Sequence, residues 1–198
     1  MTIEEKYNLY EKLLTEWNGR MNLVAKSTLG DLRGRHINDS AQLAKYIPKD
    51  KTVIDMGSGA GFPAVVLAIL GYKVIAIESI GKKCRFLETL KKELGLPNLE
   101  IINDRVENAV PGILNGKAAG PIGQKIKPKS TDFVFTARAF APLVRILDWT
   151  GKFGIPYILL KGQGAKEEIA TALEKYRFST HTYPSITGGG HVINLTIK

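Results

Sequence analysis

Three glycines at every second position, directly after a short apolar segment, form the strongest chemical pattern in this chain. Asp55 is the one acid in the apolar segment 53–56. Gly57, Gly59 and Gly61 follow it, ahead of an apolar run of helical length. This order predicts a buried parallel strand, a tight turn and the start of a helix. In α/β proteins an adenosine-bearing cofactor binds at such a turn.

The spacing of the glycines separates different kinds of cofactor site. A dinucleotide site needs Gly-x-Gly-x-x-Gly, but Phe62 stands where that pattern has its last glycine. A P-loop needs Gly-Lys-Ser/Thr, which does not follow here. The order Gly-x-Gly-x-Gly with Asp55 ahead of it resembles motif I of class I S-adenosylmethionine (SAM) methyltransferases. In that family the glycines let the backbone approach the methionine part of SAM.

An acid at the end of the next apolar segment fits the same kind of site. Glu78 follows the segment 74–77, at the distance of about 20 residues that is typical of a ribose-binding acid. A carboxylate there can accept hydrogen bonds from the ribose hydroxyl groups. The alternative is a glycine-rich turn of another α/β protein, which the strand, the glycines and the spaced acid together disfavour.

The elements that would position these residues alternate along the chain. Apolar spacing predicts a helix from residue 3 to residue 17, which Asn18-Gly19 ends, and a second helix over 39–46. Further on, strands alternate with helices. The expected strands cover 52–56, 73–77, 99–102, 132–136, 157–160, 178–183 and 191–197, and the expected helices cover 62–70, 82–94, 107–114, 142–149 and 165–176.

This alternation predicts an α/β fold of the class I SAM-methyltransferase (Rossmann-like) type. We expect a mostly parallel seven-stranded sheet covered on both faces, with the last two strands as an antiparallel hairpin. Residues 1–48 would form an N-terminal helical cap, and residues 49–198 the SAM-dependent methyltransferase domain, together in one compact unit. Residues 115–130 are rich in glycine, proline and lysine and are expected to form a loop.

Charge and composition narrow the class of partner. The chain has 198 residues, a net charge of +9 and one cysteine. Lys and Arg release counterions from phosphates, so this charge favours a nucleic-acid partner over a generic solubilising surface. A single cysteine excludes an internal disulfide and fits the cytoplasm. The longest apolar run, 64–70, is too short for a membrane span of about 20 residues, and we expect no signal peptide.

Few side chains suggest acid–base or metal chemistry. His36, His181 and His191 are scattered and form no zinc cluster with the lone cysteine, so we expect no metal. Cys84 shares the apolar face of a helix with Leu87, which indicates packing rather than a nucleophile. Methylation of cytosine C5 needs such a nucleophile. The Asn-Pro-Pro-Tyr type of motif used for adenine N6 is also absent.

Two lysines begin a predicted helix, where positive charge is unfavourable. Lys82 and Lys83 oppose the helix dipole there by about 0.3–1 kcal/mol each, so helix stability does not explain them. They either contact phosphates or form a solvated charge pair near Glu78 and Glu88.

Short motifs in order over residues 7–170 make the resemblance more specific. The chain resembles the bacterial rRNA small subunit methyltransferase G family, also called glucose-inhibited division protein B. The matching segments are Trp17-Asn18-Gly19-Arg20-Met21-Asn22-Leu23-Val24, Arg35-His36-Ile37-Asn38-Asp39-Ser40, Gly57 to Pro63, Gly81-Lys82-Lys83, Arg105-Val106-Glu107, Arg138-Ala139-Phe140-Ala141 and Lys161-Gly162.

The resemblance implies transfer of a methyl group from SAM to N7 of a guanosine in 16S rRNA, in a loop near the decoding centre. The partner would be 16S rRNA or the 30S subunit, and we expect a monomer. The resemblance adds further SAM contacts to the glycine-loop residues and Glu78. A separate set of basic residues are candidates for binding RNA. The expected cofactor-binding residues are Asp55, Gly57, Gly59, Gly61, Phe62, Glu78, Val106, Glu107 and Arg138. The RNA-binding candidates are Arg20, Arg35, His36, Lys82 and Lys83.

The expected chemistry agrees with the absence of an obvious acid–base pair. Guanine N7 carries a free lone pair and no proton, so positioning supplies most of the acceleration. We therefore assign no general base, and Arg138 and Lys161 are the candidates for positioning. A methyltransferase of a small molecule or protein, and a non-catalytic SAM-binding RNA module, are the alternatives. Two features depart from the family: the long link 115–130, and Gly190 where many members have arginine.

Overall fold

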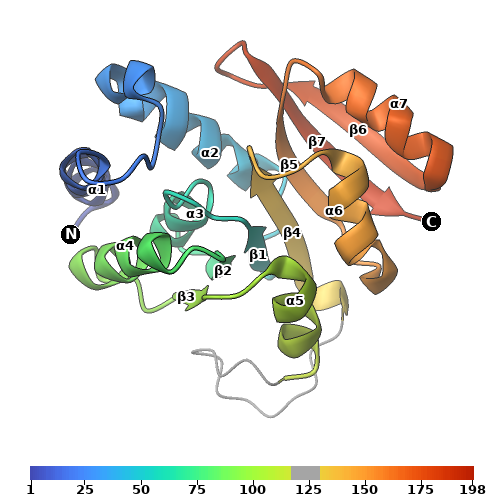
Figure 1. Cartoon of the computed structure of the whole chain (residues 1–198), viewed down its shortest axis with the longest axis horizontal. Coiled ribbons are helices and arrows are strands. Elements are labelled where there is room, and N and C mark those ends of the chain that lie inside the picture. Colours follow the sequence, from blue (N-terminus) through green and yellow to red (C-terminus); the bar gives the residue numbers. More distant parts are fainter. Residues whose placement is uncertain (117–129) are drawn as a thin grey trace.

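Seven strands form one twisted sheet at the centre of the molecule (Figure 1). The computed structural model describes residues 1–116 and 130–198. Strands β1 to β5 are parallel, and β7 runs antiparallel to both of its neighbours, β5 and β6, in the order β3-β2-β1-β4-β5-β7-β6. The strands are β1 (Thr52–Met56), β2 (Lys73–Ile77), β3 (Leu99–Ile102), β4 (Phe133–Arg138), β5 (Tyr157–Gly162), β6 (Phe178–Pro184) and β7 (Gly190–Ile197). The predicted fold class and the terminal antiparallel hairpin are confirmed.

Strand order places a crevice at the carboxyl ends of β1 and β4. From β1 the chain moves outward to β2 and β3, and then returns to the other side of β1 to form β4. Ligands of open α/β sheets bind where the order reverses in this way. The glycine loop follows β1, and Arg138 is the last residue of β4, so both lie at this crevice.

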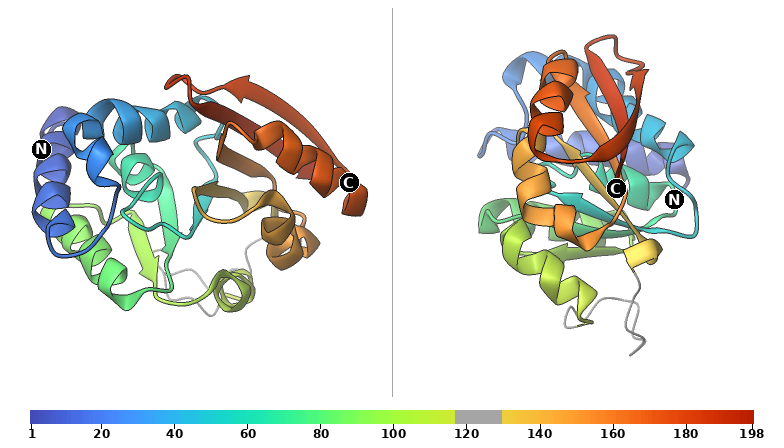
Figure 2. Two further views of the ribbon diagram at one scale, coloured as in Figure 1. Left: turned by 45° about the horizontal axis from the view of Figure 1, so that its top comes forward. Right: turned by 90° about the vertical axis from the view of Figure 1, so that its right-hand side faces the viewer.

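Alternate residues of the central strands face two different sets of helices, which cover the two faces of the sheet (Figure 2). Val53 and Val134 pack with α1, α3 and α4, whereas Ile54 and Phe135 pack with α5, α6 and α7. This is the period of two that strands require. The helices are α1 (Ile3–Asn18), α3 (Ala64–Ile69), α4 (Gly81–Glu93), α5 (Val106–Leu114), α6 (Leu143–Thr150) and α7 (Ala165–Lys175).

Strands β4 and β5 run further than their apolar segments predict. They end at Arg138 and Gly162, each two residues beyond the predicted ends at 136 and 160. The backbone of Lys161 and Gly162 pairs with His191 and Gly190 of β7. Pairing with a strand that is distant in sequence therefore extends β5 through residues with weak strand propensity.

The cap contains a longer helical stretch than the predicted helix over 39–46. It begins with a π-helical segment, Arg33–Asn38, and continues through α2 (Asp39–Ala41) and a 3₁₀ segment, Gln42–Lys45; another 3₁₀ segment, Lys26–Asp31, precedes it. Arg33 is held by Glu4, Asn8 and Glu11 of α1. These distant contacts explain why local apolar spacing missed the start.

The cap shares its hydrophobic core with the sheet. Tyr10 and Leu14 of α1 belong to the same buried cluster as Leu67 of α3 and Phe86 of α4. Cap and sheet are therefore packed together, and the division at residue 48 stays a prediction. The predicted long loop falls mostly on residues 117–129, outside the described part of the chain. Within residues 1–116 and 130–198, no helix combines the length and the apolar character that a membrane span requires.

Candidate functional site

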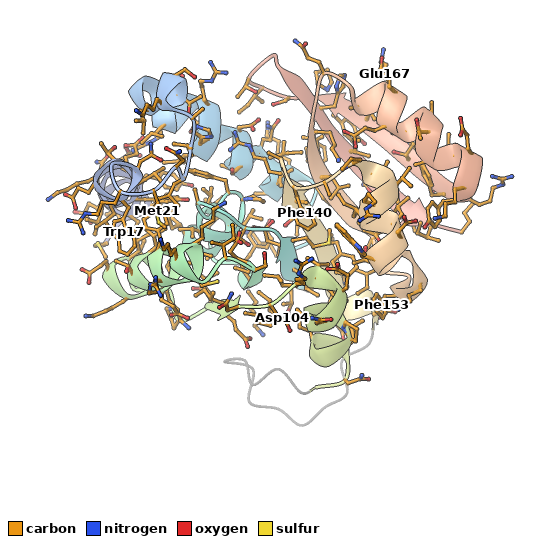
Figure 3. The ribbon with its side chains drawn as sticks, in the orientation of Figure 1. Trp17, Met21, Asp104, Phe140, Phe153 and Glu167 are labelled. Carbon is orange, nitrogen blue, oxygen red and sulfur yellow. The ribbon has the colours of Figure 1, made fainter. Side chains whose placement is uncertain are left out.

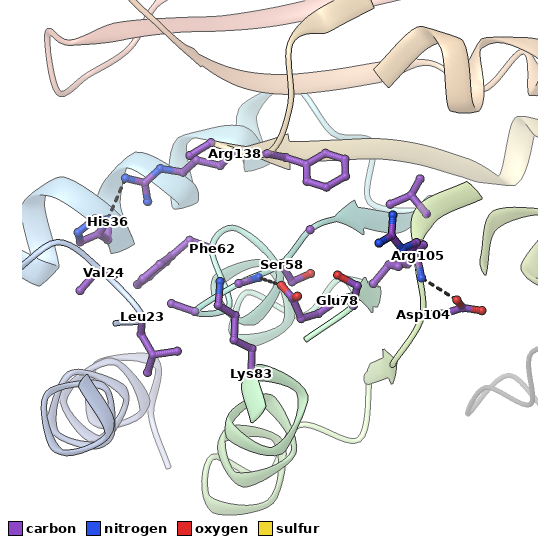
Figure 4. A pocket seen from close by; sticks show the side chains of 18 of the residues that line it. Leu23, Val24, His36, Ser58, Phe62, Glu78, Lys83, Asp104, Arg105 and Arg138 are labelled. Carbon is purple, nitrogen blue, oxygen red and sulfur yellow. Dashed lines mark hydrogen bonds between the residues drawn. The ribbon is translucent and has the colours of Figure 1, made fainter. Parts of the chain in front are cut away.

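A cavity of about 600 Å³ opens at the carboxyl ends of β1, β2 and β4 (Figure 4). We call it the cofactor cavity. Its floor is the glycine loop after β1, and its sides come from the end of β2, the start of α5 and the cap. The predicted cofactor-binding residues that line it are Gly57, Gly59, Phe62, Glu78, Val106, Glu107 and Arg138. The structure thus brings seven of the nine predicted residues to one cavity.

The backbone of the glycine loop is shaped to leave room above it. Gly59 has a φ of 56°, and an added Cβ would meet no atom closer than 3.8 Å. Gly57 has a φ of 71°, and an added Cβ would overlap the ring of Phe140, which lies after β4 in the middle of the molecule (Figure 3). The ring of Phe140 therefore requires glycine at position 57, whereas the glycine at position 59 leaves open space for a ligand.

Glu78 joins the glycine loop to the end of β2. Its Oε2 accepts the N–H of Gly59 at 2.9 Å, and its Oε1 accepts the N–H of Ile80 at 2.8 Å. The N–H groups of Gly57 and Ser58 donate to the carbonyl of Ile77 at 2.9 and 3.0 Å. The carboxylate is thereby fixed beside the loop, and each of its oxygens retains a lone pair for a ligand hydroxyl.

The start of α5 forms another side of the cofactor cavity. Val106 is its first residue and is buried, whereas Glu107 is exposed. Asp104 accepts the N–H of Arg105 at 2.7 Å (Figure 4). It also accepts the side-chain amide of Asn108 at 3.0 Å. Asp104 and Arg105 line the cavity but were not predicted as site residues. Their position in the sequence, just after the third predicted strand, could have indicated that they line the cavity.

The cap supplies residues that sequence reasoning missed. Leu23 and Val24 line the cofactor cavity, and both of their N–H groups donate to the side-chain oxygen of buried Asn18. The hydroxyl of Tyr10 donates to the carbonyl of Ala60 at 2.6 Å. The Trp-Asn…Asn-Leu motif could have indicated Leu23 and Val24, because Asn18 of this motif holds their backbone in the cavity wall.

Three side chains from separate elements stack at the edge of the cofactor cavity. The rings of His36 and Phe62 stack with centroids 5.1 Å apart, and the guanidinium of Arg138 lies 5.6 Å from the Phe62 centroid. The Tyr10 ring also stacks on Phe62, with centroids 5.2 Å apart. Two rings of the cap, those of Tyr10 and His36, thus pack against Phe62.

The hydrogen bonds of His36 fix its neutral form. Nη2 of Arg138 can only donate, so Nδ1 of His36, 2.9 Å away, accepts (Figure 4). Nε2 then carries the proton and donates to Oγ1 of Thr28 at 2.8 Å, whose hydroxyl donates to the carbonyl of Ala25. Burial, followed by the nearby Arg138 cation, lowers the pKa of His36 to about 4. His36 is uncharged at neutral pH.

Arg138 reaches into the cap rather than across the cofactor cavity. Its Nε lies 3.2 Å from Oδ2 of Asp39, and Nη2 also donates to the carbonyl of Arg35 at 2.9 Å. Oδ1 of Asp39 accepts from Gln42 at 2.8 Å and from Ser185, in the hairpin between β6 and β7, at 2.6 Å. Asp39 therefore connects the cap, the end of β4 and the hairpin. A direct contact of Arg138 with the cofactor stays a prediction.

Two predicted cofactor residues do not line the cofactor cavity: Asp55, in β1, and Gly61, in the loop itself. Asp55 is fully buried, accepts from Thr136 at 3.1 Å, and has a pKa that burial raises to about 6. An added Cβ at Gly61 would lie 2.6 Å from Val65 and 2.8 Å from the hydroxyl of Tyr10. Their positions suit a role in supporting the loop.

Lys161, a predicted positioning residue, is used inside the protein. Its Nζ donates to the carbonyl of Ala141 at 2.5 Å and pairs with Glu168 of α7 at 2.7 Å. Glu168 also accepts the N–H of Leu143 at the start of α6. Lys161 thus holds the segment after β4 against α7, and a role in positioning the substrate stays a prediction.

The RNA-binding candidates occupy different settings. Arg20, Arg35 and Lys82 are exposed, and Lys83 points from α4 toward the cofactor cavity (Figure 4). His36 is buried, with both ring nitrogens bonded inside the protein. RNA binding by these residues stays a prediction, and Lys83 also lines the cofactor cavity.

A second cavity, of about 710 Å³, adjoins the first. Its walls are the cap around Arg35, the end of β5 at Gly162, and the hairpin between β6 and β7. The two cavities share Thr28, His36, Arg138 and Ala139. Among the described residues, no group of three or more His, Cys, Asp or Glu side chains could hold a metal ion.

Comparison with known proteins identifies the family. A family model described as rRNA small subunit methyltransferase G matches residues 3–193. The chain belongs to this family. The ribosomal RNA small subunit methyltransferase G of Orientia tsutsugamushi (strain Ikeda) is 42% identical over 186 residues, covering 92% of this chain and 84% of the relative. That of Dinoroseobacter shibae is 37% identical over 190 residues, covering 90% of this chain and 87% of the relative.

Solved structures agree with this assignment at the level of fold. A Bacillus cereus O-methyltransferase in complex with SAH superposes with a TM-score of 0.61 at 14% identity, covering 96% of this chain and 90% of that one. A precorrin-6y C5,15-methyltransferase from Geobacter metallireducens gives a TM-score of 0.55 at 11% identity, covering 90% and 92%. The predicted family, enzyme class and cofactor are confirmed: the protein is a SAM-dependent rRNA methyltransferase.

The residues of the cofactor cavity fit SAM. Its volume of about 600 Å³ lies within the range of about 300–1,000 Å³ for small-molecule sites. Glu78 offers a fixed carboxylate to the ribose hydroxyl groups, and the open space above Gly59 admits a ligand close to the backbone. Phe62 and Val106 add apolar surface.

Proposed function

We propose that this protein transfers a methyl group from SAM to N7 of a guanosine in 16S rRNA. The observation that carries the proposal is the juxtaposition of Glu78 and the open glycine loop in a chain that the rRNA small subunit methyltransferase G model matches over residues 3–193. The target lies in the small-subunit rRNA loop near the decoding centre. The protein acts on 16S rRNA or the 30S subunit as a monomer in the cytoplasm, and its net charge of +9 favours such a partner.

The reaction needs no proton transfer from the protein. SAM supplies an electrophilic methyl group: the N7 lone pair forms the new N–C bond, while the electron pair of the C–S bond stays on sulfur. Guanine N7 carries no proton, so no base is needed, and the positive charge passes from sulfur to the methylated base. The protein therefore contributes mainly by holding both partners in line.

The groups around the shared boundary of the two cavities tolerate this positive charge. His36 is neutral, and Phe62 presents an aromatic ring beside it. The charge of Arg138 is compensated by Asp39 at 3.2 Å. Neutral and compensated neighbours avoid repulsion of either the cationic donor or the cationic product.

Incorporation of labelled methyl groups tests the proposal. Purified protein is incubated with methyl-labelled SAM and one of three acceptors: 16S rRNA, 30S subunits from cells that lack this activity, or a small-molecule and protein extract free of ribosomes. We expect label in rRNA, and its release as N7-methylguanosine after nuclease digestion. Label in the ribosome-free extract alone would favour a small-molecule or protein substrate. SAM binding without transfer to any acceptor would favour a non-catalytic RNA module.

A further inference from the structure

The second cavity has the position and the construction of a substrate site. It borders the cofactor cavity along His36, Arg138 and Ala139. A group held in it would therefore lie next to a ligand of the cofactor cavity. Its volume, about 710 Å³, exceeds that of a single planar base and is within the usual range for ligand sites.

Backbone strain marks the boundary between the two cavities. Ala139 has a φ of 49°, and among the described residues it is the one non-glycine residue with a positive φ. This conformation costs a residue with a Cβ about 1–2 kcal/mol. Strain of this kind is retained mainly where the surrounding structure enforces it, often at functional sites. Here it shapes the chain between β4 and α6 where the cavities meet.

The walls of the second cavity are held by buried polar contacts. Asp39 accepts from Arg138 of β4, from Gln42 of the cap and from Ser185 of the hairpin. The side-chain oxygen of Gln42 accepts the N–H of Ile186 at 3.1 Å. The three elements around the cavity are thereby fixed to one another without a ligand, which reduces the entropic cost of binding one.

The surface of the second cavity suits a nucleotide. Gly162, Gly189 and Gly190 line the cavity without side chains, so a planar base can approach the backbone there. At Gly190 an added Cβ would overlap the carbonyl oxygen of Lys161, which keeps this part of the wall flat. Arg35 is exposed on the cavity wall and forms no ion pair with the rest of the described chain. A free guanidinium beside a flat surface matches a phosphate next to a base.

From this geometry we propose that the second cavity binds the target guanine, flipped out of its RNA loop, with N7 directed at the boundary shared with the cofactor cavity. Arg35 contacts a phosphate of the same or an adjacent nucleotide. Guanine N7 lies on the major-groove edge of the base, and the major groove of an RNA helix is too deep and narrow for side chains to read. Enzymes that modify a base they cannot reach in a helix bring it out of the stack, and the cavity provides a place for it. This inference rests on the proposed function, because it assigns the acceptor of that same reaction.

Gly162 offers a direct way to close the cavity. Side chains two residues apart on a strand share a face, and Leu160 packs on the cap side of the sheet. A side chain at 162 would therefore point toward the cap, and no atom lies within 4 Å of the position of its Cβ. Gly162→Trp should place an indole ring in the space proposed for the base, and the open space at its Cβ allows this without a clash. Gly112 in α5 lines neither cavity and also has open space at its Cβ, so Gly112→Trp is the matched control.

Photocrosslinking tests where the base lies. We would assemble 30S subunits on 16S rRNA with 6-thioguanosine at the position that the wild-type protein methylates, and irradiate them with protein and S-adenosylhomocysteine. The expected crosslinks fall in residues 160–162 or 185–190. Gly162→Trp should lower crosslinking and single-turnover methylation at least tenfold, with SAM affinity by calorimetry within twofold of wild type. Gly112→Trp should match wild type in all three measurements.

Several outcomes would overturn the inference. Crosslinks confined to other segments, or wild-type crosslinking and methylation by Gly162→Trp, would show that the base binds elsewhere. If Gly162→Trp does not fold, Gly189→Trp carries the same test, because its Cβ position is also open and also lines the cavity. Wild-type protein that methylates no rRNA would instead refute the proposed function, which separates the two failures.

Discussion

Replacement of Arg138 should loosen the connection between the cap, β4 and the β6–β7 hairpin. Arg138→Ala removes the ion pair with Asp39 at 3.2 Å and two hydrogen bonds, to His36 and to the carbonyl of Arg35, at 2.9 Å each. It also leaves the Asp39 carboxylate, whose side chain is 10% exposed, without its cationic partner. Each of these losses destabilises the folded state.

The magnitude follows from the burial of the pair. Loss of one partner of a fully buried ion pair costs about 3–5 kcal/mol. Because the Arg138 side chain keeps 19% of its exposure, we expect the lower end, about 3 kcal/mol. For a chain of this size that is a fall in melting temperature of about 6–12 °C. Arg138→Lys keeps the charge but loses the planar fork, so it should fall between Arg138→Ala and wild type.

Thermal unfolding and SAM calorimetry on the same variants check this reasoning. Lys175→Ala, which removes the exposed pair with Asp148, is the control and should melt close to wild type. We expect SAM affinity of Arg138→Ala to fall less than about tenfold, or 1.4 kcal/mol, because the hydrogen bonds that fix Glu78 beside Gly59 do not involve Arg138. Unchanged melting with a much larger loss of SAM affinity would refute the connecting role and make Arg138 a direct cofactor ligand.

Three further predictions concern the cofactor loop, the RNA surface and pH. Gly59→Asp should fold, since aspartate tolerates a positive φ and the space is open, but it should not bind SAM; a folded variant with wild-type affinity in calorimetry would contradict the site. Lys82→Gln should reduce the salt slope of RNA binding by about 0.7 without changing SAM affinity, and an unchanged slope would make Lys82 a solvated charge. Because burial lowers the pKa of His36 to about 4, whereas the unfolded chain binds this proton near pH 6.5, stability is lost as the pH falls through that window. The difference in unfolding free energy between wild type and His36→Gln should therefore shift by about 2 kcal/mol between pH 7 and pH 5. A constant difference would mean that the pKa of His36 is the same in the folded and unfolded protein. Asp55, whose pKa is raised to about 6, has the opposite effect on stability, but that effect is common to both proteins and cancels in the difference.

The sequence predicted the parallel core closely because local patterns specify it. The predicted bounds of β1, β2 and β3 match the structure at both ends. These segments are apolar and are bounded by glycine or polar residues, so the period and the end of each strand are visible in the chain. The glycine spacing and Glu78 located the cofactor cavity for the same reason.

The parts that escaped prediction depend on contacts between distant residues. The π-helical segment at Arg33 is held by α1, and the end of β5 by β7. Arg138 was expected at the crevice, but its binding to Asp39 depends on where the cap folds. The second cavity is formed by three elements far apart in the chain, so no local pattern could indicate it.

If this protein methylates N7 of one guanosine in 16S rRNA, that base should carry the methyl group only in cells that make the protein. The most direct test is a map of N7-methylguanosine in 16S rRNA from cells with and without the protein. We predict that one modified guanosine is lost in its absence, restored by the wild-type gene, and not restored by Gly59→Asp expressed at the same level. Identical N7-methylguanosine maps in the two strains would show that the protein does not make this modification.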